Sequence, residues 1–485
     1  MLKKNFVILI ALVLITMIFV PSVMSEEKLN DDLFYKLIKT ENDKPEIKIP
    51  DYKKIKFDNG LTAYLVKNNK YPVVEITGFI KGGRRQENQE VAGISNIMLN
   101  MMSTGTQNLG EEEYAEFKEI HGIDINFNVS NDTFNFRGSA LSSEKDKLIS
   151  ILADSLRKPD FSASYFQRIL QQQHQYLAQA TVQPDPMLNN YFFKNIYQEH
   201  PYSFANNISL KKSKIKTFTP DKLRNFYNKS IGPEKMVIAI VGDFSINNTQ
   251  EILKDNFADW EKQNISIKEN EIKEMAYNDQ IIIVDKKDAD QAHMKIGYNF
   301  DGHQFKKETE FLIGNRIFGK GGFSSRLMEN VRSEKGYVYS IYSNTSYNKD
   351  GGVYYINTKL DPQKAPEVLE AVKDEMTAIK TTEKPITAEE IKESINLYNG
   401  LLPSDYKYPI DIINEYIYKT ELLNENDDYL NDFIDEYNNL TAQEVQSVME
   451  EYLKPDKLLT VVVGDSGQLK KVFKKAGYKV KIIKN

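Results

Sequence analysis

The chain has 485 residues, of which 41% are hydrophobic and 27% charged; this composition fits two or more globular domains and excludes a disordered tail or a fibre. The formal net charge of -6 and the pI near 5.7 provide no basic stripe for a phosphate backbone, so we expect no nucleic-acid partner. The chain has no cysteine, so disulfides and lipid-modified cysteines are excluded, and core burial must stabilise the fold.

The first 25 residues have the order of a secretory signal peptide. Lys3 and Lys4 precede an apolar run at 6–20, and small residues follow before Glu26. We expect cleavage after Ser25, which removes both lysines and changes the net charge from -6 to -8. A retained membrane anchor is the alternative, although the apolar run is slightly short for a full span. The predicted location is periplasmic or extracellular, with membrane anchoring if the segment stays uncleaved.

The chain contains an internal repeat. Residues 219–243 align without a gap on residues 441–465, and their apolar positions agree. The identical pairs are Thr219/Thr441, Pro233/Pro455, Lys235/Lys457, Val241/Val463, Gly242/Gly464 and Asp243/Asp465. Each copy predicts a threonine N-cap, a helix, a proline turn and a buried strand. Two unrelated units with similar turns are the alternative, but a gapless match of this length favours duplication.

Each half of the chain is predicted to be an α+β domain with a mainly antiparallel sheet packed against helices. In the first half, KIKFDNGLTAYLVKNN and VVEITGFIKGG predict a starting hairpin or meander, and helical patterns follow at 111–121, 143–156 and 165–180. In the second half, QIIIVDKK and AHMKIGYNF predict strands, and 362–381 and 388–399 predict helices.

These elements divide the chain into segments. The charged, weakly apolar stretch at 263–278 is interpreted as a linker between the halves. We therefore place a signal peptide at 1–25, an N-terminal extension at 26–50, a first domain at 51–245, a final helix and linker at 246–278, and a second domain at 279–485.

Residues 93–106, GISNIMLNMMSTGT, contain an unusual pattern. Two carboxamides, Asn96 and Asn100, lie four positions apart, and Leu99 lies between them at the third position. This spacing places all three side chains on one face of a helix. The surrounding apolar residues are Ile94, Ile97, Met98, Met101 and Met102, and they predict a mostly buried helix.

The chain resembles the insulinase/pitrilysin family of inverted zinc metallopeptidases, which includes the mitochondrial processing peptidase subunits. The resemblance runs from about Asp51 to Gly467 and rests on two α+β halves that each close on a Gly-Asp strand. It also rests on the phrases GISNIMLNMMSTGT, GIDINFNVSNDTFNF, HPYSFANN and GGFSSRLMENVRSEKGYVYSIYS. It implies two duplicated LuxS/metallopeptidase-like halves.

The resemblance also implies an emptied zinc site. In active members this helix carries H-x-x-E-H, in which two histidines bind zinc and the glutamate polarises water. Here Asn96 and Asn100 take the histidine positions and Leu99 the glutamate position, and these side chains neither bind zinc well nor accept a proton. The family's third ligand is a downstream glutamate expected at 166–180, where the sequence has no acidic residue. We therefore expect no metal in this chain.

A metal site rebuilt from other residues is the alternative. The five histidines are His121, His174, His200, His293 and His303, and no two of them have helical or hairpin ligand spacing. We interpret His200 as a turn residue at the end of a helix and His174 as a helix-surface residue.

The second informative phrase is GKGGFSSRLMENVRSEKGYVYSIYS at 319–343. In the family, the arginine and tyrosine that match Arg332 and Tyr339 hold the substrate carbonyl and its developing oxyanion. A guanidinium and a phenol suit this role because both donate hydrogen bonds to negative charge. The alternative is a surface ion pair of Arg332 with Glu329 or Glu334 and a tyrosine on a half-buried strand.

A glycine-rich loop precedes this arginine, and a helix is predicted to begin at Ser324 or Ser325. By the same resemblance, Gly319, Gly321 and Gly322 are expected to contact the substrate.

Loss of the zinc residues together with retention of the arginine and tyrosine implies a partner chain. Some bacterial members resemble this arrangement, in which two similar subunits form a heterodimer and one carries H-x-x-E-H. The resemblance therefore predicts a zinc-bearing paralogous partner, or a homodimer, acting on unfolded or short peptides bound as an added strand at a sheet edge. The alternatives are a binding or scaffold protein without a role in catalysis, and a stand-alone zinc peptidase with atypical ligands.

Overall fold

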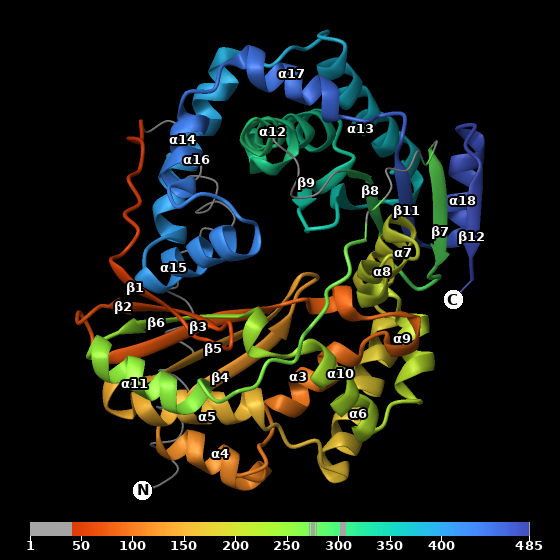
Figure 1. The fold of residues 1–485 in the computed structure, drawn as a ribbon. Helices are drawn as coiled ribbons and strands as arrows, with labels where there is room; N and C mark the ends of the chain where they lie inside the picture. The colour runs from red at the N-terminus through yellow and green to blue at the C-terminus, as the bar shows by residue number, and fades with distance from the viewer. Residues whose placement is uncertain (1–40, 271, 273–276, 278, 301–306, 485) are drawn as a thin grey trace, which may run out of the picture.

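The chain folds into two halves, each built on a six-stranded sheet (Figure 1). The structure is a computed structural model and describes residues 41–484 apart from 271, 273–276, 278 and 301–306. The predicted signal peptide at 1–25 lies outside the described residues. Among those that are described, no helix is both long and apolar enough to cross a membrane.

The first sheet has the strand order β1-β2-β6-β3-β5-β4. Its strands are β1 (Tyr52–Lys56), β2 (Thr62–Lys67), β3 (Val73–Lys81), β4 (Asp124–Val129), β5 (Thr133–Leu141) and β6 (Met236–Gly242). Only β2 and β6 run parallel, and the other neighbouring strands are antiparallel. Side chains alternate between the two faces, so Ile238 and Ile240 join one apolar cluster while Val237 and Val241 join another on the opposite face.

Most of the helices of the first half cover one face of this sheet, below it in Figure 1. The helices are α3 (Ile94–Met102), α4 (Glu111–Ile120), α5 (Lys145–Arg157), α6 (Ala163–Ala180), α7 (Pro184–Tyr197), α8 (Pro201–Asn206), α9 (Ile208–Ile215), α10 (Pro220–Ser230) and α11 (Ile246–Phe257). The predicted helices at 111–121, 143–156 and 165–180 correspond to α4, α5 and α6. Amphipathic spacing identified them because each buries apolar side chains in the core of the first half.

The second sheet has the order β12-β7-β11-β8-β10-β9, which repeats the first except at one edge, where β12 comes from the end of the chain and pairs parallel with β7. Its strands are β7 (Gln280–Asp285), β8 (Ala292–Phe300), β9 (Val338–Ser346), β10 (Gly352–Leu360), β11 (Leu459–Gly464) and β12 (Val480–Ile483). β11 takes the place of β6, and β9 takes the place of the edge strand β4. The predicted α+β class with two duplicated halves is therefore confirmed.

The helices of the second half are α12 (Glu308–Asn315), α13 (Ala365–Lys380), α14 (Ala388–Asp405), α15 (Pro409–Ile417), α16 (Tyr429–Asn438), α17 (Ala442–Tyr452) and α18 (Ser466–Lys475). Three short π-helical segments, η5 (Arg316–Lys320), η7 (Met328–Glu334) and η9 (Tyr418–Leu422), also lie in this half. Such segments are rare and are frequently found at functional sites.

The two copies of the internal repeat have the same local structure. Thr219 caps α10 by accepting the Lys222 amide at 3.2 Å, and Thr441 caps α17 by accepting the Glu444 amide at 3.3 Å. Each helix is followed by a fully buried strand, β6 or β11, at the third place of its sheet. The aligned stretches thus form equivalent structural units.

The predicted hairpin at the start of the first half is confirmed, but its extension into a meander is wrong. β1 and β2 pair across a turn in which Gly60 has φ 92°. β3 pairs with β5 and β6 and not with β2, because β6 lies between β2 and β3. The pattern of residues 52–81 could not predict this, because β6 comes from residues 236–242, far along the chain.

Two helices pack against the sheet of the opposite half. α7 packs on the second sheet, where Phe192 and Ile196 join Val461 in one apolar cluster. α15 packs on the first sheet, where Ile413 joins Ala239 (Figure 1). Each sheet thus has one face covered by helices of its own half and the other face covered by a helix of the other half.

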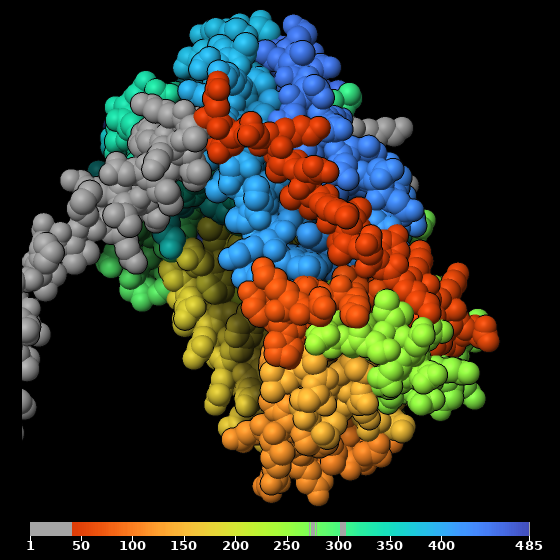
Figure 2. Space-filling model, turned by 90° about the vertical axis from the view of Figure 1, so that its left-hand side faces the viewer, coloured from red at the N-terminus to blue at the C-terminus, as the bar shows by residue number. Residues whose placement is uncertain are grey.

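Residues 41–50 run along the second half before the chain enters β1, as the red segment in Figure 2 shows. The Asn42 amide donates to Asn396 Oδ1 at 2.6 Å, and Lys44 pairs with Asp435. Ile47 is 6% exposed and belongs to the core of the second half. This described part of the N-terminal extension therefore links the second half to the first strand of the first.

Candidate functional site

The helix that corresponds to the zinc-binding helix is α3, and the chain before it fixes its start. Gly93 is the N-cap residue with φ 86°, a left-handed conformation that glycine adopts without strain. The Glu87 carboxylate accepts the amides of Gly93 at 2.8 Å and Ser95 at 3.1 Å, and Glu87 is 3% exposed. A carboxylate in this position satisfies free amide groups and is stabilised by the helix dipole. Glu87 thus anchors the start of α3.

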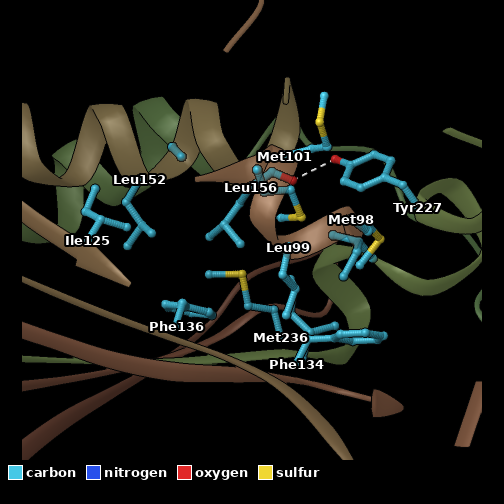
Figure 3. Packing of buried hydrophobic residues seen from close by; sticks show 14 of the residues in the cluster. Met98, Leu99, Met101, Ile125, Phe134, Phe136, Leu152, Leu156, Tyr227 and Met236 are labelled. Atoms are coloured by element: carbon cyan, nitrogen blue, oxygen red, sulfur yellow. Dashed lines mark hydrogen bonds between the residues drawn. The ribbon is translucent and has the colours of Figure 1, made fainter. Parts of the chain in front are cut away.

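The glutamate position of the motif is a packing position in this protein. Leu99 is 3% exposed and points from α3 toward Phe134 and Met236 of the sheet (Figure 3). Met98 and Met101 are wholly buried on the same helix, so the prediction of a mostly buried helix is confirmed. Burial of a carboxylate at this position would be costly, because Leu99 belongs to an apolar cluster.

The two histidine positions differ from each other. Asn100 is exposed, whereas Asn96 is half-buried and its Oδ1 accepts a hydrogen bond from Arg84 Nη2 at 3.3 Å. Burial lowers the pKa of Arg84, but a guanidinium keeps its charge because its ordinary value is so high. A fixed cation beside one ligand position repels a divalent cation. These residues therefore do not fit zinc.

The helix expected to supply the third ligand does lie beside α3. α6 packs against α3. Its residues include Gln173, Tyr176 and Leu177, and none of its residues is a carboxylate that could serve as the third ligand. Tyr176 is close enough to Arg84 to interact electrostatically with it. Throughout residues 41–484, with the gaps given above, no group of three or more His, Asp or Glu side chains is arranged to hold a metal ion.

Arg332 and Tyr339 are brought together in the second half. The Arg332 guanidinium carbon lies 5.5 Å from the centre of the Tyr339 ring and 4.5 Å from that of Phe323. The alternative ion pairs with Glu329 or Glu334 do not form in the described structure, where Arg332 makes only these ring contacts. Its N–H donors therefore remain available to a ligand.

The local backbone directs both side chains. Arg332 lies in the π-helical segment η7, and Tyr339 lies at the start of the edge strand β9. The pairing of β9 with β10 shifts register between Thr358 and Leu360, so a β-bulge lies beside Tyr339. Bulges redirect side chains near active sites. Tyr339 is 63% exposed, and no described residue forms a hydrogen bond with its hydroxyl.

The structure explains why the loop before Arg332 needs glycine at three positions. A Cβ atom on Gly319 would lie 2.6 Å from Ser343 Oγ, and one on Gly321 would lie 2.5 Å from Arg316 O. Both glycines are buried, and Gly322 has φ 69°. Close packing and a left-handed turn thus account for them, and their contact with substrate stays a prediction. The helical turns begin directly after Ser325, in line with the predicted start.

The two sets of candidate residues lie in different halves of the chain. α3 packs against β4, α6 and α10, whereas β9 packs against β10, η5 and η7. In Figure 1, α3 is in the lower half and β9 in the upper half. Within the described residues, no hydrogen bond, ion pair or ring contact joins Arg332 or Tyr339 to Asn96, Leu99 or Asn100.

Three of the histidines, His121, His200 and His293, have carboxylate partners among the described residues. His121 Nδ1 lies 2.9 Å from Glu144 and His293 Nδ1 lies 2.6 Å from Asp185. His174 is half-buried on α6, and His303 lies outside the described residues. His200 is at the end of a helix as predicted, as the N-cap of α8, but it is also buried.

A buried polar cluster between the halves was not predicted. Arg85 Nη2 donates to Asp350 at 2.5 Å, and Tyr202 donates to Asp132 at 2.5 Å. His200 Nε2 lies 3.2 Å from the second oxygen of Asp350. Burial raises the pKa of Asp132, and the hydrogen bond from Tyr202 opposes this effect. We call Arg85, Asp132, His200, Tyr202 and Asp350 the interhalf cluster.

The sequence carries one signal for both unpredicted arginines. Two glycines and two arginines, Gly82 to Arg85, follow directly on the apolar strand β3. Gly82 and Gly83 have φ values of 137° and 56°, which glycine adopts readily. After this turn, Arg84 reaches Asn96 of α3 and Arg85 reaches Asp350 of the second half.

Two family models match consecutive stretches of the chain. The model described as "Insulinase (Peptidase family M16)" matches residues 63–206, and the one described as "Peptidase M16 inactive domain" matches residues 217–398. The matched stretches together cover more than half of the chain. The protein belongs to the insulinase family, peptidase family M16. This confirms the resemblance drawn from the sequence, and Asn96, Leu99 and Asn100 make it a member without the zinc-binding motif.

Relatives within family M16 align with most of the chain. The "Uncharacterized zinc protease YmxG" of Bacillus subtilis is 22% identical over 83% of this chain and 96% of its own length. An "Uncharacterized zinc protease" of Rickettsia felis is 28% identical over 73% of this chain and 83% of its own. The "Non-peptidase homolog YmxG" of Helicobacter pylori is 24% identical over 61% of this chain and 68% of its own.

Solved structures show the same fold. The peptidase M16 inactive domain of Pseudomonas fluorescens superposes with a TM-score of 0.77 at 21% identity, over 86% of this chain and 98% of that one. A protease from Helicobacter pylori superposes with a TM-score of 0.77 at 20% identity, over 86% of this chain and 100% of that one. The arrangement of two α+β halves is therefore that of M16 proteins.

Proposed function

We propose that this M16 protein is the exported, non-zinc subunit of a heterodimeric zinc metallopeptidase. A paralogous partner supplies the zinc and the general base, and this chain supplies Arg332 and Tyr339. The substrate is an unfolded or short peptide. By itself the chain is peptidase-like and non-catalytic.

One observation carries the proposal: the zinc-site positions have lost their chemistry, whereas Arg332 and Tyr339 keep free hydrogen-bond donors. On α3, Leu99 is buried at the position of the general base, and the Arg84 guanidinium lies beside Asn96 at one ligand position. In the second half, by contrast, Arg332 of η7 and Tyr339 of β9 are adjacent, and their side-chain hydrogen-bond donors are free within the described structure. Donors held in this way suit an oxyanion that forms on a substrate bound to another chain.

The sheet edges support peptide binding. β4 beside α3 and β9 with Tyr339 are the end strands of their sheets, and each has one strand neighbour in the described structure. A peptide that adds to such an edge is recognised through its backbone, so selectivity for sequence is weak. The chemistry at Tyr339 would then act on a carbonyl of that added strand.

Co-purification from the native cell, followed by reconstitution, tests the proposal. We expect the protein to bring down a paralogue that carries H-x-x-E-H. In the reconstituted pair, Tyr339→Phe should lower turnover of an unfolded peptide on the order of a hundredfold, because one oxyanion donor contributes about 2.7 to 4 kcal/mol. Arg332→Ala should act similarly and also raise KM if the guanidinium holds the ground-state carbonyl.

Matched controls are Tyr408→Phe and Arg224→Ala, which change exposed residues that belong to neither candidate site. Gel filtration establishes whether each variant still assembles. Unchanged turnover in both Tyr339→Phe and Arg332→Ala, with assembly preserved, would refute the proposal and favour the binding or scaffold role.

A further inference from the structure

A pocket of about 400 Å³ opens on the face of the second sheet that α7 covers. This volume lies in the range of ligand sites, roughly 300 to 1,000 Å³. One row of residues crosses its three strands, since Lys295 of β8 pairs with Asn357 of β10, which pairs with Tyr342 of β9. Ser340, the residue after Tyr339, also lines the pocket. The pocket therefore reaches the strand that carries Tyr339.

Lys295 is the unusual member of the lining. It is 4% exposed, and its Nζ lies 4.0, 5.0 and 5.5 Å from the ring centres of Tyr355, Phe193 and Phe192. In the described part of the chain, this ammonium has no hydrogen-bond acceptor and no ion-pair partner. Ring faces attract a cation but replace only part of its lost hydration. Burial accordingly lowers the pKa of Lys295 to about 7, and Asp185 opposes this only in part.

The other charged groups around the pocket are already paired. Asp185, at the start of α7, lies 2.6 Å from His293 Nδ1 on β8 and 3.1 Å from Lys359 Nζ on β10. Burial raises the pKa of Asp185, but the hydrogen bonds from His293 and Lys359 outweigh this and leave it below its ordinary value. Lys295 is therefore the unpaired charge in the pocket lining.

We propose that this pocket binds a carboxylate group of a peptide, with the Lys295 ammonium as its buried partner. A single ammonium between aromatic walls matches one negative charge. The carboxamides of Asn189 and Asn357 and the hydroxyl of Ser340 provide hydrogen bonds for the adjoining peptide groups. The carboxylate comes from an acidic side chain or from a peptide C-terminus. Binding needs no partner subunit, so it stands apart from the proposed function.

Labelled peptides test this on the isolated full-length protein. The probes are an unstructured Gly/Ser decapeptide with one central Glu and an amidated C-terminus, the same peptide with Gln, and the Gln peptide with a free C-terminus. Fluorescence polarisation should show that one or both carboxylate peptides bind roughly tenfold to a hundredfold more tightly than the amidated Gln peptide. The carboxylate peptide that binds more tightly identifies the source of the group.

Lys295→Met should abolish this difference, while Lys147→Met, a change of an exposed lysine on α5, should preserve it. In wild type, the preference should weaken from pH 6 to pH 8.5, because the ammonium that binds the carboxylate loses its proton. Equal affinities of the three peptides for wild type, or an unchanged preference in Lys295→Met, would overturn the proposal.

A second measurement does not require a variant. Limiting trinitrobenzenesulfonate at pH 7 should modify Lys295 ahead of exposed lysines, because its amine is partly unprotonated, and the binding peptide should protect it. Peptide mapping by mass spectrometry identifies the modified residue. Modification of Lys295 at the same rate with and without the peptide would contradict binding at this pocket.

Discussion

Arg85 of the first half and Asp350 of the second half form an ion pair with 2.5 Å between Nη2 and Oδ1, and their side chains are 4% and 5% exposed. Asp350 lies in the turn between β9 and β10, which is equivalent to the turn between β4 and β5 that carries Asp132. Arg85 Nε also lies 3.8 Å from Asp132 Oδ1, so the two equivalent turns meet at one arginine. This contact fixes the strand that carries Tyr339 relative to the first half.

Arg85→Met should destabilise the protein by about 3 to 5 kcal/mol, because it leaves the buried carboxylates of Asp132 and Asp350 without their cation. Urea unfolding at pH 7 measures the change. The matched control is Arg224→Met, whose partner Asp221 is 87% exposed and whose loss should cost about 0 to 1 kcal/mol. Equal effects of the two substitutions would contradict a structural role for the interhalf cluster.

Leu99→Glu should destabilise the protein strongly, although it restores a residue of the family motif. The new carboxyl group would be buried against Phe134 and Met236 without a partner, which we expect to cost on the order of 3 kcal/mol or more. Thermal unfolding measures the effect. Asn100→His, on the exposed side of the same helix, should change stability by less than about 0.5 kcal/mol. A fully stable Leu99→Glu variant would show that this position is not part of the core.

The purified protein should hold no stoichiometric zinc and should not cleave unfolded peptides alone. The triple variant Asn96→His, Leu99→Glu, Asn100→His should remain inactive, because α6 offers no carboxylate and Arg84 keeps a positive charge beside position 96. Elemental analysis and a casein-type assay with chelator check both statements. One tightly held zinc per wild-type chain, or chelator-sensitive cleavage by the variant, would disprove them.

Lys295→Met should stabilise the protein at pH 6, on the order of 2 kcal/mol, because it removes a buried, unpaired charge. The folded pKa of about 7 lies below the unfolded value near 10.4, so the unfolded chain binds more protons between these values. The destabilisation by Lys295 is thus complete below pH 7 and is relieved as the pH rises toward 10.4. Urea midpoints of both proteins should therefore converge from pH 6 to pH 10, and a constant difference would contradict the assignment.

Ile47→Ala should destabilise the protein by about 2 to 4 kcal/mol, because Ile47 fills a place in the core of the second half. Lys48→Ala, at the next and exposed position, should have little effect. Differential scanning calorimetry of both variants measures this. If Ile47→Ala unfolds like wild type, the extension does not contribute to the folded core.

Much of the fold and of the candidate site could be predicted because it depends on residues that are close together in the sequence. The repeat at 219–243 and 441–465 identified the buried strands β6 and β11, since an apolar run after a capped helix and a proline turn has few alternatives. The emptied motif on α3 followed from the resemblance to the family's H-x-x-E-H helix, because neither a leucine nor a carboxamide can replace the zinc chemistry. The Arg332 and Tyr339 positions followed from the resemblance of the phrase around them.

The sequence by itself determined two α+β halves, a buried α3 without zinc ligands, and the placement of Arg332 and Tyr339 in the second half. Only the tertiary structure decided that β6 separates β2 from β3, that α7 and α15 cross between the halves, and that Arg84 reaches Asn96. It also decided that Lys295 is buried among rings. The physical reason is distance along the chain: composition and periodicity report what a segment buries, whereas its partner is chosen by packing among segments far apart in sequence.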